Sequence, residues 1–179
     1  MYIRVLIAEL WIIMEYVYCI FCETRRCRAV ADKLQEKVVD IAFSPQIVKR
    51  QRKAGKNIDM LYDLLPGYVF AYSKKELPSI SVLRVDGVIR ILGSSDNGYC
   101  LTGADKDFAN GLLEREGRID VMKVIHVGDT VFLEDELFPG QRGRILEIDY
   151  RKQRAKIEFS FMNTTCYSWV ACDVISRTL

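Results

Sequence analysis

The sequence predicts an α+β domain with a mostly antiparallel sheet and flanking helices, followed by a small β-barrel. In the first two thirds of the chain, two segments carry apolar residues at helical spacing, and extended runs lie between them. From residue 127 onward the pattern changes to short alternating strands with glycine turns and no helical stripe. Half of the 179 residues are apolar, which is enough for a core in each domain.

The first domain is predicted to span residues 14–117. Its first helix has the clearest periodicity, because Cys27, Val30, Ala31 and Leu34 recur at spacings of three and four. The mixed order of several strands and few long helices favours an antiparallel sheet. The extended runs are at 15–21, 40–50, 58–73 and 88–93, the helices at 24–38 and 101–117, and a polar loop without acids at 51–57.

The second domain is predicted to span residues 127–179 and to follow a linker at 118–126. Close spacing of strands and glycine turns is typical of a small barrel. Residues 1–13 are interpreted as an N-terminal extension, since Met14 offers a second start. The strand candidates of the second domain are 130–134, 144–149, 154–161 and 167–170.

The apolar N-terminus predicts neither a membrane span nor a secretory signal. Arg4, Glu9 and Glu15 interrupt the first 22 residues, and no small-residue cleavage site is present. Six cysteines are too sparse for a disulfide scaffold. We therefore expect a cytoplasmic protein that has reduced thiols and does not contact a membrane.

The residues that could carry catalysis or bind a metal form no recognisable group. Cys19 and Cys22 would point to opposite faces of one strand, and Cys27 would lie on the core side of a helix, so a shared zinc ion is not expected. The chain has a single histidine, no nucleophile–base pair and no phosphate-binding glycine loop. The sequence thus predicts no enzyme activity and no cofactor.

The stretch "LLPGYVFAYS" at 64–73 places a proline and a glycine directly before an apolar strand. Tyr68, Phe70 and Tyr72 share one face of that strand, and Val69 and Ala71 share the other. Two interpretations stay open. Either the rest of the fold covers both faces, or the aromatic face waits for a partner.

Two clusters of basic residues could neutralise phosphates, although a solvated basic face is the commoner role for such clusters. Tyr150, Tyr167 and Trp169 lie close to the second cluster in sequence and could stack on unpaired bases, but Trp169 could equally belong to the barrel core. The first cluster contains Lys49, Arg50, Arg52, Lys53 and Lys56, and the second contains Arg142, Arg144, Arg151, Lys152, Arg154 and Lys156.

Two motifs in the correct order resemble the NusG family of transcription elongation factors. "LLPGYVFAYS" looks like the Pro-Gly-Tyr-Val signature of the NusG N-terminal domain. "VGDTVFLEDELFPGQRGRILEIDYRKQRAKIEF" looks like the KOW motif. The resemblance covers residues 14–176, and within the family the chain looks most like the specialised paralogues called LoaP, which promote antitermination across long biosynthetic operons.

The resemblance implies an N-terminal NusG-type domain joined to an SH3-like KOW barrel. The N-terminal domain would dock on the clamp region of RNA polymerase through an apolar surface. Tyr68 matches the docking tyrosine of the family, whereas Leu65 stands where the family usually has an aromatic residue. The residues expected at the polymerase surface are Tyr16, Tyr18, Leu65, Tyr68, Phe70 and Tyr72.

The KOW domain departs from the general elongation factors in one segment. These factors carry a Phe-Gly-Arg-x-Thr-Pro loop that couples them to the ribosome, and here the matching stretch "FMNTTCYSW" lacks the glycine, the arginine and the proline. The expected partner of the barrel is therefore nascent RNA, as a structured hairpin, bound by a monomeric protein. The residues expected to bind RNA are Lys49, Arg50, Arg52, Lys53, Arg142, Arg144, Arg151, Lys152, Arg154 and Lys156. A general elongation factor and a ribosomal RNA-binding KOW protein remain the alternatives.

Overall fold

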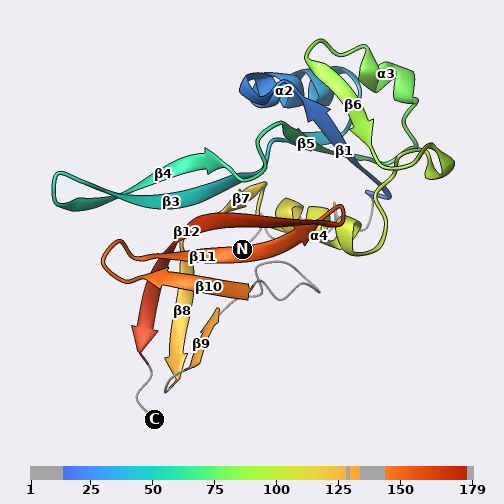
Figure 1. Ribbon diagram of the computed structural model, residues 1–179. Helices are drawn as coiled ribbons and strands as arrows, with labels where there is room; N and C mark the ends of the chain where they lie inside the picture. Colours follow the sequence, from blue (N-terminus) through green and yellow to red (C-terminus); the bar gives the residue numbers. More distant parts are fainter. Residues whose placement is uncertain (1–13, 128–129, 134–143, 177–179) are drawn as a thin grey trace, which may run out of the picture. The chain divides into compact units, whose positions relative to one another are not determined.

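The computed structural model describes residues 14–127, 130–133 and 144–176, and the chain divides into two compact units (Figure 1). The first unit contains residues up to Pro45 together with Leu65–Ala109, and the second contains Gln46–Leu64 together with the chain from Asn110 onward. The first unit combines strands with helices, whereas the described part of the second consists of strands apart from the end of α4. The predicted domain boundaries at 14–117, 118–126 and 127–179 stay a prediction.

The first unit is built on a four-stranded antiparallel sheet in the order β2-β5-β1-β6. The predicted helices are confirmed, with ends that differ by a few residues. A short 3-10 turn, Thr24–Arg26, precedes the first of them. The strands are β1 Tyr16–Cys22, β2 Ile41–Phe43, β5 Tyr68–Ser73 and β6 Val88–Leu92, and the helices are α2 Cys27–Lys37, α3 Ser79–Leu83 and α4 Gly103–Glu114, with a second 3-10 turn at Ser95–Asn97.

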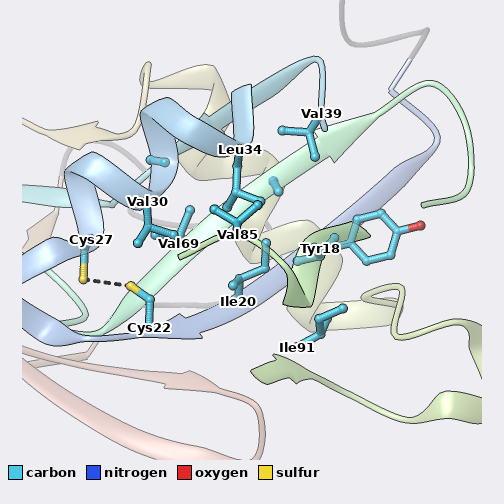
Figure 2. Packing of buried hydrophobic residues seen from close by; sticks show 13 residues of the cluster. Tyr18, Ile20, Cys22, Cys27, Val30, Leu34, Val39, Val69, Val85 and Ile91 are labelled. Carbon is cyan, nitrogen blue, oxygen red and sulfur yellow. Dashed lines mark hydrogen bonds between the residues drawn. The ribbon is translucent and has the colours of Figure 1, made fainter. Parts of the chain in front are cut away.

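Helix α2 covers one face of this sheet and forms the main core with it (Figure 2). Its predicted apolar stripe is buried, with Val30 and Leu34 fully inaccessible to solvent. A fully buried aliphatic side chain of this size contributes about 1.5–3 kcal/mol relative to an exposed one. The sheet supplies Tyr18, Ile20 and Cys22 from β1, Val69 and Ala71 from β5, and Ile91 from β6.

The opposite face of the sheet is covered by the first half of α4. Phe70 on β5 packs against Phe108 of the helix, with ring centroids 6.1 Å apart. The hydroxyl of Tyr72 donates a hydrogen bond of 2.6 Å to the carbonyl of Ala109. The side chains of Phe70 and Tyr72 have 0% exposure, so at these two positions the fold itself covers both faces of β5.

The second unit begins with a long β-hairpin. Strand β3, Gln46–Lys53, pairs with β4, Lys56–Asp63, and the register brings Lys53 opposite Lys56. The two turn residues, Ala54 and Gly55, have φ values of 47° and 79°, as a two-residue hairpin turn with the twist of the strands requires. The prediction of a polar loop over 51–57 is therefore wrong, because most of these residues are paired strand residues flanking a minimal turn.

A five-stranded sheet in the order β10-β11-β12-β8-β9 forms the rest of the second unit (Figure 1). Strand β12 pairs antiparallel with β11 over its first part and parallel with β8 over its last part. A two-residue strand, β7, adds to β3 in a separate three-stranded sheet, β4-β3-β7. The strands are β7 Arg118–Ile119, β8 Met122–Val127, β9 Thr130–Leu133, β10 Arg144–Asp149, β11 Arg154–Phe161 and β12 Thr164–Ser176.

The four strands predicted after residue 127 are confirmed, but β7 and β8 lie where the sequence suggested a linker. Along β11, Ala155, Ile157, Phe159 and Phe161 point inward and are buried. Among the described strands no ladder joins β9 to β10, so closure into a barrel stays a prediction. In the described part of the chain, no helix combines the length and the apolarity needed to cross a bilayer.

Candidate functional site

The two tyrosines of β1 do not share a face with Tyr68, contrary to the prediction. The antiparallel register places Tyr16 opposite Ser73 and Tyr18 opposite Ala71, on the side of the sheet that α2 covers. Tyr18 is buried, its hydroxyl accepts a 3.0 Å hydrogen bond from the backbone N–H of Leu77, and burial raises its pKa. A surface centred on Tyr68 therefore does not include these two rings.

Three further residues predicted at the surface are part of the protein interior. Phe70 and Tyr72 lie beneath α4, and burial raises the pKa of Tyr72 well above its ordinary value. Leu65 is also buried, and its carbonyl accepts a 3.1 Å hydrogen bond from the N–H of Tyr68. The expectation of an exposed surface is wrong at these positions, and at Phe70 and Tyr72 the reason is that a helix distant in sequence covers them.

Tyr68 is different, since it remains half-buried at the first position of β5. Its cross-strand neighbour is Phe21 of β1, whose ring lies edge-on to it with centroids 5.5 Å apart. Arg90 of β6 is exposed, pairs with Phe21 on the other side, and places its guanidinium 5.6 Å from the Phe21 ring. We name these three residues the Phe21–Tyr68 surface.

Gly67 permits this arrangement. Its φ of +92° is unfavourable for any residue with a side chain, and a Cβ atom there would lie 2.9 Å from a ring carbon of Phe21. Its carbonyl accepts a 2.8 Å hydrogen bond from the N–H of Cys22, which extends the contact between the two strands. Phe21 cannot be recognised from the sequence alone, because the register between β1 and β5 is needed to place it beside Tyr68.

Arg50, predicted to bind RNA, is instead a structural residue of the second unit. Its guanidinium donates two hydrogen bonds, of 2.6 and 2.8 Å, to the carboxylate of Asp59. Its Nη1 donates further bonds to Asp173 at 3.0 Å and to the carbonyl of Cys172 at 3.3 Å. The hydrogen bonds from Arg50 lower the pKa of Asp59. The Arg50 side chain is only 11% exposed, and its bonds stabilise the packing of the hairpin against β12. Arg50 is therefore not available to RNA, contrary to the prediction.

The other hairpin cations differ in accessibility. Lys49 is half-buried, its ammonium lies 5.3 Å from the ring of Tyr62, and burial lowers its pKa. Arg52 and Lys53 are exposed near the turn. Of the four hairpin cations predicted to bind RNA, only these two are exposed, and Lys56, the fifth cation of the cluster, is exposed as well.

The structure brings the two predicted basic clusters together. Asn57 of the hairpin donates a 3.1 Å hydrogen bond to the side chain of Gln153, which lies in the turn between β10 and β11. Arg151 and Lys152 belong to the same turn, with Arg151 exposed. The turn and the hairpin thus present cations to one region of the second unit. Arg142 lies outside the described residues, and of Arg144 only the backbone, at the start of β10, is described.

The outer side of β11 and β12 carries cations and aromatic rings in cross-strand contact. Lys156 pairs with Trp169, and the guanidinium of Arg154 lies 4.2 Å from the Trp169 ring. The ammonium of Lys156 lies 5.7 Å from the ring of Tyr167, and Tyr167 is 56% exposed. We name these four residues the β11–β12 surface. Trp169 points away from the core, because its neighbours Ser168 and Val170 are the buried residues of this segment.

The NusG family model, described as "Transcription termination factor nusG", matches residues 16–106. This chain belongs to the NusG family. The transcription termination/antitermination protein NusG of Rickettsia felis is 27% identical over 135 residues, which cover 74% of this chain and 70% of that protein. A solved structure described as "Domain interaction in Thermotoga maritima NusG" is 17% identical, with a TM-score of 0.52, and the match covers 87% of this chain and 93% of that one. The likeness to this solved structure supports the assignment of the fold.

The two surfaces differ in whether the segment matched by the NusG family model includes them. All three residues of the Phe21–Tyr68 surface lie inside the segment that the NusG family model matches. The β11–β12 surface lies beyond residue 106, outside that segment. The family model therefore bears on the segment that carries the first surface and not on the segment that carries the second.

The cysteines behave as the sequence predicted. Cys19 and Cys22 lie on opposite faces of β1, so they cannot bind one metal ion. The sulfur atoms of Cys22 and Cys27 are 3.3 Å apart in the core (Figure 2). Burial raises the pKa of Cys19, which keeps this thiol protonated at neutral pH. These thiols are packing residues of the first unit.

Proposed function

We propose that this NusG family member is a specialised transcription processivity and antitermination factor of the LoaP type. It docks on the clamp region of RNA polymerase through the Phe21–Tyr68 surface and binds nascent RNA through its second unit. The observation that carries the docking proposal is the contrast along β5. Phe70 and Tyr72 are fully buried, whereas Tyr68, in the Pro-Gly-Tyr-Val signature, stays half-exposed beside Phe21 and Arg90.

The chemistry of this surface suits an apolar helical partner with an acidic flank. An edge-to-face aromatic pair offers a rigid apolar contact of the kind that supplies most of the energy of an interface. Arg90 adds an exposed cation at its margin, which favours encounter with a negatively charged partner. Gly67 keeps the two rings in contact, so the surface is formed before the partner arrives.

The effect on transcription is a shift between polymerase conformations. A factor that binds the closed-clamp state more tightly than the open state increases the population of the closed state. A preference of 100-fold corresponds to about 2.7 kcal/mol. No catalytic group is needed for this mechanism, because the free energy comes from differential binding.

RNA binding is proposed for the cations that the second unit gathers near the β10–β11 turn. Arg151 and Lys152 lie in the turn, and Arg52 and Lys53 lie on the neighbouring hairpin. Each phosphate that these cations neutralise in a single strand contributes a slope of about −0.7 to the dependence of log affinity on log salt. Replacing Arg151, Lys152 and Arg154 by alanine is therefore expected to weaken RNA binding and to flatten its salt dependence.

The decisive experiment is in vitro transcription through a terminator, with and without a structured leader RNA. We expect read-through that requires both the factor and the leader. Tyr68→Ala is expected to abolish read-through by weakening polymerase binding by about 2 kcal/mol, or roughly 30-fold. Absence of read-through with wild-type protein on every template would contradict the proposed function.

A general elongation factor that couples polymerase to the ribosome or to a termination factor is the second candidate, supported by the family description as a transcription termination factor. The segment matching the coupling loop is a two-residue turn here, because Phe161 pairs with Thr164 across Met162 and Asn163. Both turn residues have positive φ, of 49° and 58°. Leader-independent activity together with retention of ribosomal subunits in a pull-down would select this candidate. Co-sedimentation with ribosomes alone would select a ribosomal KOW protein.

A further inference from the structure

We infer that the β11–β12 surface is a stacking platform for unpaired RNA bases, so that the RNA partner is read in a single-stranded loop and not along its stem. This inference rests on the proposed RNA binding by the second unit. The ligand class is single-stranded RNA, with bases on Trp169 and Tyr167 and phosphates on the cations beside them.

The outward position of the two rings, with Tyr167 exposed and Trp169 half-buried, is the first argument. The inner side of the sheet is already filled by Ile157, Phe159 and Val170, which are all buried. Tyr167 and Trp169 lie on the outer side, and Tyr167 is 56% exposed. An aromatic ring left in water gains little for folding, whereas a base stacked on it contributes binding energy whatever the base.

The spacing of the rings is the second argument. Tyr167 and Trp169 are two residues apart on one strand, which places their Cα atoms about 6.8 Å apart on the same side of the sheet. Each ring can therefore hold one base of a strand that crosses the sheet. Aromatic residues on an open sheet face stack two or three successive bases in this way in other RNA-binding folds.

The cations give the third argument, because they are held next to the rings. The carboxylate of Asp149 accepts a 3.3 Å hydrogen bond from Nε of Arg154 and a 3.0 Å bond from the backbone N–H of Lys152. These bonds fix the Arg154 guanidinium over the indole of Trp169, 4.2 Å from the ring. A planar cation stacked on an aromatic ring can contact a phosphate with its edge while the ring contacts a base.

The acids of this face define where the phosphates can run. Glu158 is the cross-strand neighbour of Tyr167, at the end of the surface away from the β10–β11 turn. Glu147 is the cross-strand neighbour of Lys156. At the turn end three cations, Arg151, Lys152 and Arg154, face the single carboxylate of Asp149, which pairs with two of them. The phosphate backbone is therefore expected at the turn end, where the charges are attractive, with the bases pointing toward Tyr167. A duplex cannot bind in this manner, because its bases are stacked and paired inside the helix.

The test compares a single-stranded RNA oligonucleotide with a blunt-ended duplex of the same length. The full chain is used in a Trp11→Phe background, so that Trp169 is its sole tryptophan. We expect the single strand to quench the Trp169 fluorescence and to bind at least tenfold more tightly than the duplex in the same salt. Anisotropy of labelled RNA then measures the variants. Tyr167→Ala and Trp169→Ala are each expected to weaken single-strand binding by about 5- to 100-fold.

Matched variants separate stacking from folding. Tyr167→Phe keeps the ring and is expected to bind within about twofold of wild type, as is Thr165→Ala, an exposed residue of the same strand. If duplex and single strand bind equally, or if Tyr167→Ala binds like Tyr167→Phe, the stacking inference is overturned while the proposed RNA binding stands. If the wild-type chain binds neither RNA, the stacking inference and the proposed RNA binding are both contradicted. The polymerase proposal is then tested by the Tyr68→Ala transcription assay alone.

Discussion

Strands β5 and β12 both alternate aromatic residues with other side chains, yet their rings end in opposite environments. Phe70 and Tyr72 of β5 are fully buried, because α4 lies over that face of the sheet. Tyr167 of β12 is 56% exposed and contacts a lysine. Alternation therefore determines which residues share a face, but the exposure of that face depends on elements elsewhere in the chain.

The largest expected effect compares one ring from each strand. Phe70→Ala removes a fully buried ring that touches Phe108 and is expected to lower the free energy of unfolding by about 3–5 kcal/mol. Tyr167→Ala is expected to change it by less than about 0.5 kcal/mol. Urea denaturation followed by circular dichroism measures both. Equal losses for the two variants would mean that the two strands do not differ as described.

A second comparison concerns cations of one strand. Arg50→Ala leaves the carboxylates of Asp59 and Asp173 without their shared partner and is expected to cost about 2 kcal/mol. Arg52→Ala, at an exposed position two residues later, is the control and is expected to be near neutral in stability. Thermal unfolding should show the difference, and amide exchange should show faster opening of the hairpin in Arg50→Ala. Unchanged thermal unfolding and unchanged amide exchange of the hairpin in Arg50→Ala would contradict the structural role assigned to Arg50.

A smaller effect is expected from single hydroxyl groups. Tyr72→Phe loses the buried 2.6 Å hydrogen bond to the carbonyl of Ala109 and is expected to cost about 1 kcal/mol. Tyr167→Phe, whose ring is exposed, is the matched substitution on the other strand and is expected to cost nothing measurable. Chemical denaturation of the pair tests this, and a loss confined to Tyr167→Phe would reverse the comparison.

The smallest effect concerns a carboxylate at the surface of the first unit. Hydrogen bonds from Arg26 and then Lys33 lower the pKa of Asp86 to about 2, from an ordinary 3.8. Because the folded-state pKa is depressed, the contribution of this group is complete above about pH 4 and is lost as the pH falls toward 2. Asp86→Asn should lower the midpoint temperature slightly at pH 7 and reduce its change between pH 4 and 2. An identical acid profile in wild type and variant would rule out this contribution.

Local patterns were sufficient to predict most of the secondary structure. The helix expected at 24–38 is α2 with its preceding turn, and the strands expected after residue 127 are present, because both follow from the spacing of apolar residues. The hairpin turn at Ala54 was missed, since a polar and basic stretch offers no alternation to indicate a strand. The NusG motifs predicted the family, which the comparison with known sequences shows.

The candidate surfaces were harder to predict, for a physical reason. Tyr16 and Tyr18 were placed beside Tyr68, but the register between two strands puts Phe21 there. Exposure could not be read from the sequence either, because the helix that covers Tyr72 lies 37 residues further along the chain. In the same way, composition cannot separate Arg50, held by two carboxylates, from the exposed Arg52.

The ion pair between Arg50 and Asp173 joins residues 123 positions apart, and this separation bears on synthesis in the cell. At about 5–20 residues per second, the hairpin leaves the ribosome on the order of ten seconds before the strand that receives it. Throughout that interval Arg50 lacks its partner Asp173, and β3 lacks the strand β12 that packs against it. The second unit therefore depends on timely translation of its last strand, β12. A ribosome that stalls after the β3–β4 hairpin and before β12 would leave the hairpin without its packing partner, so that it could associate with other nascent chains.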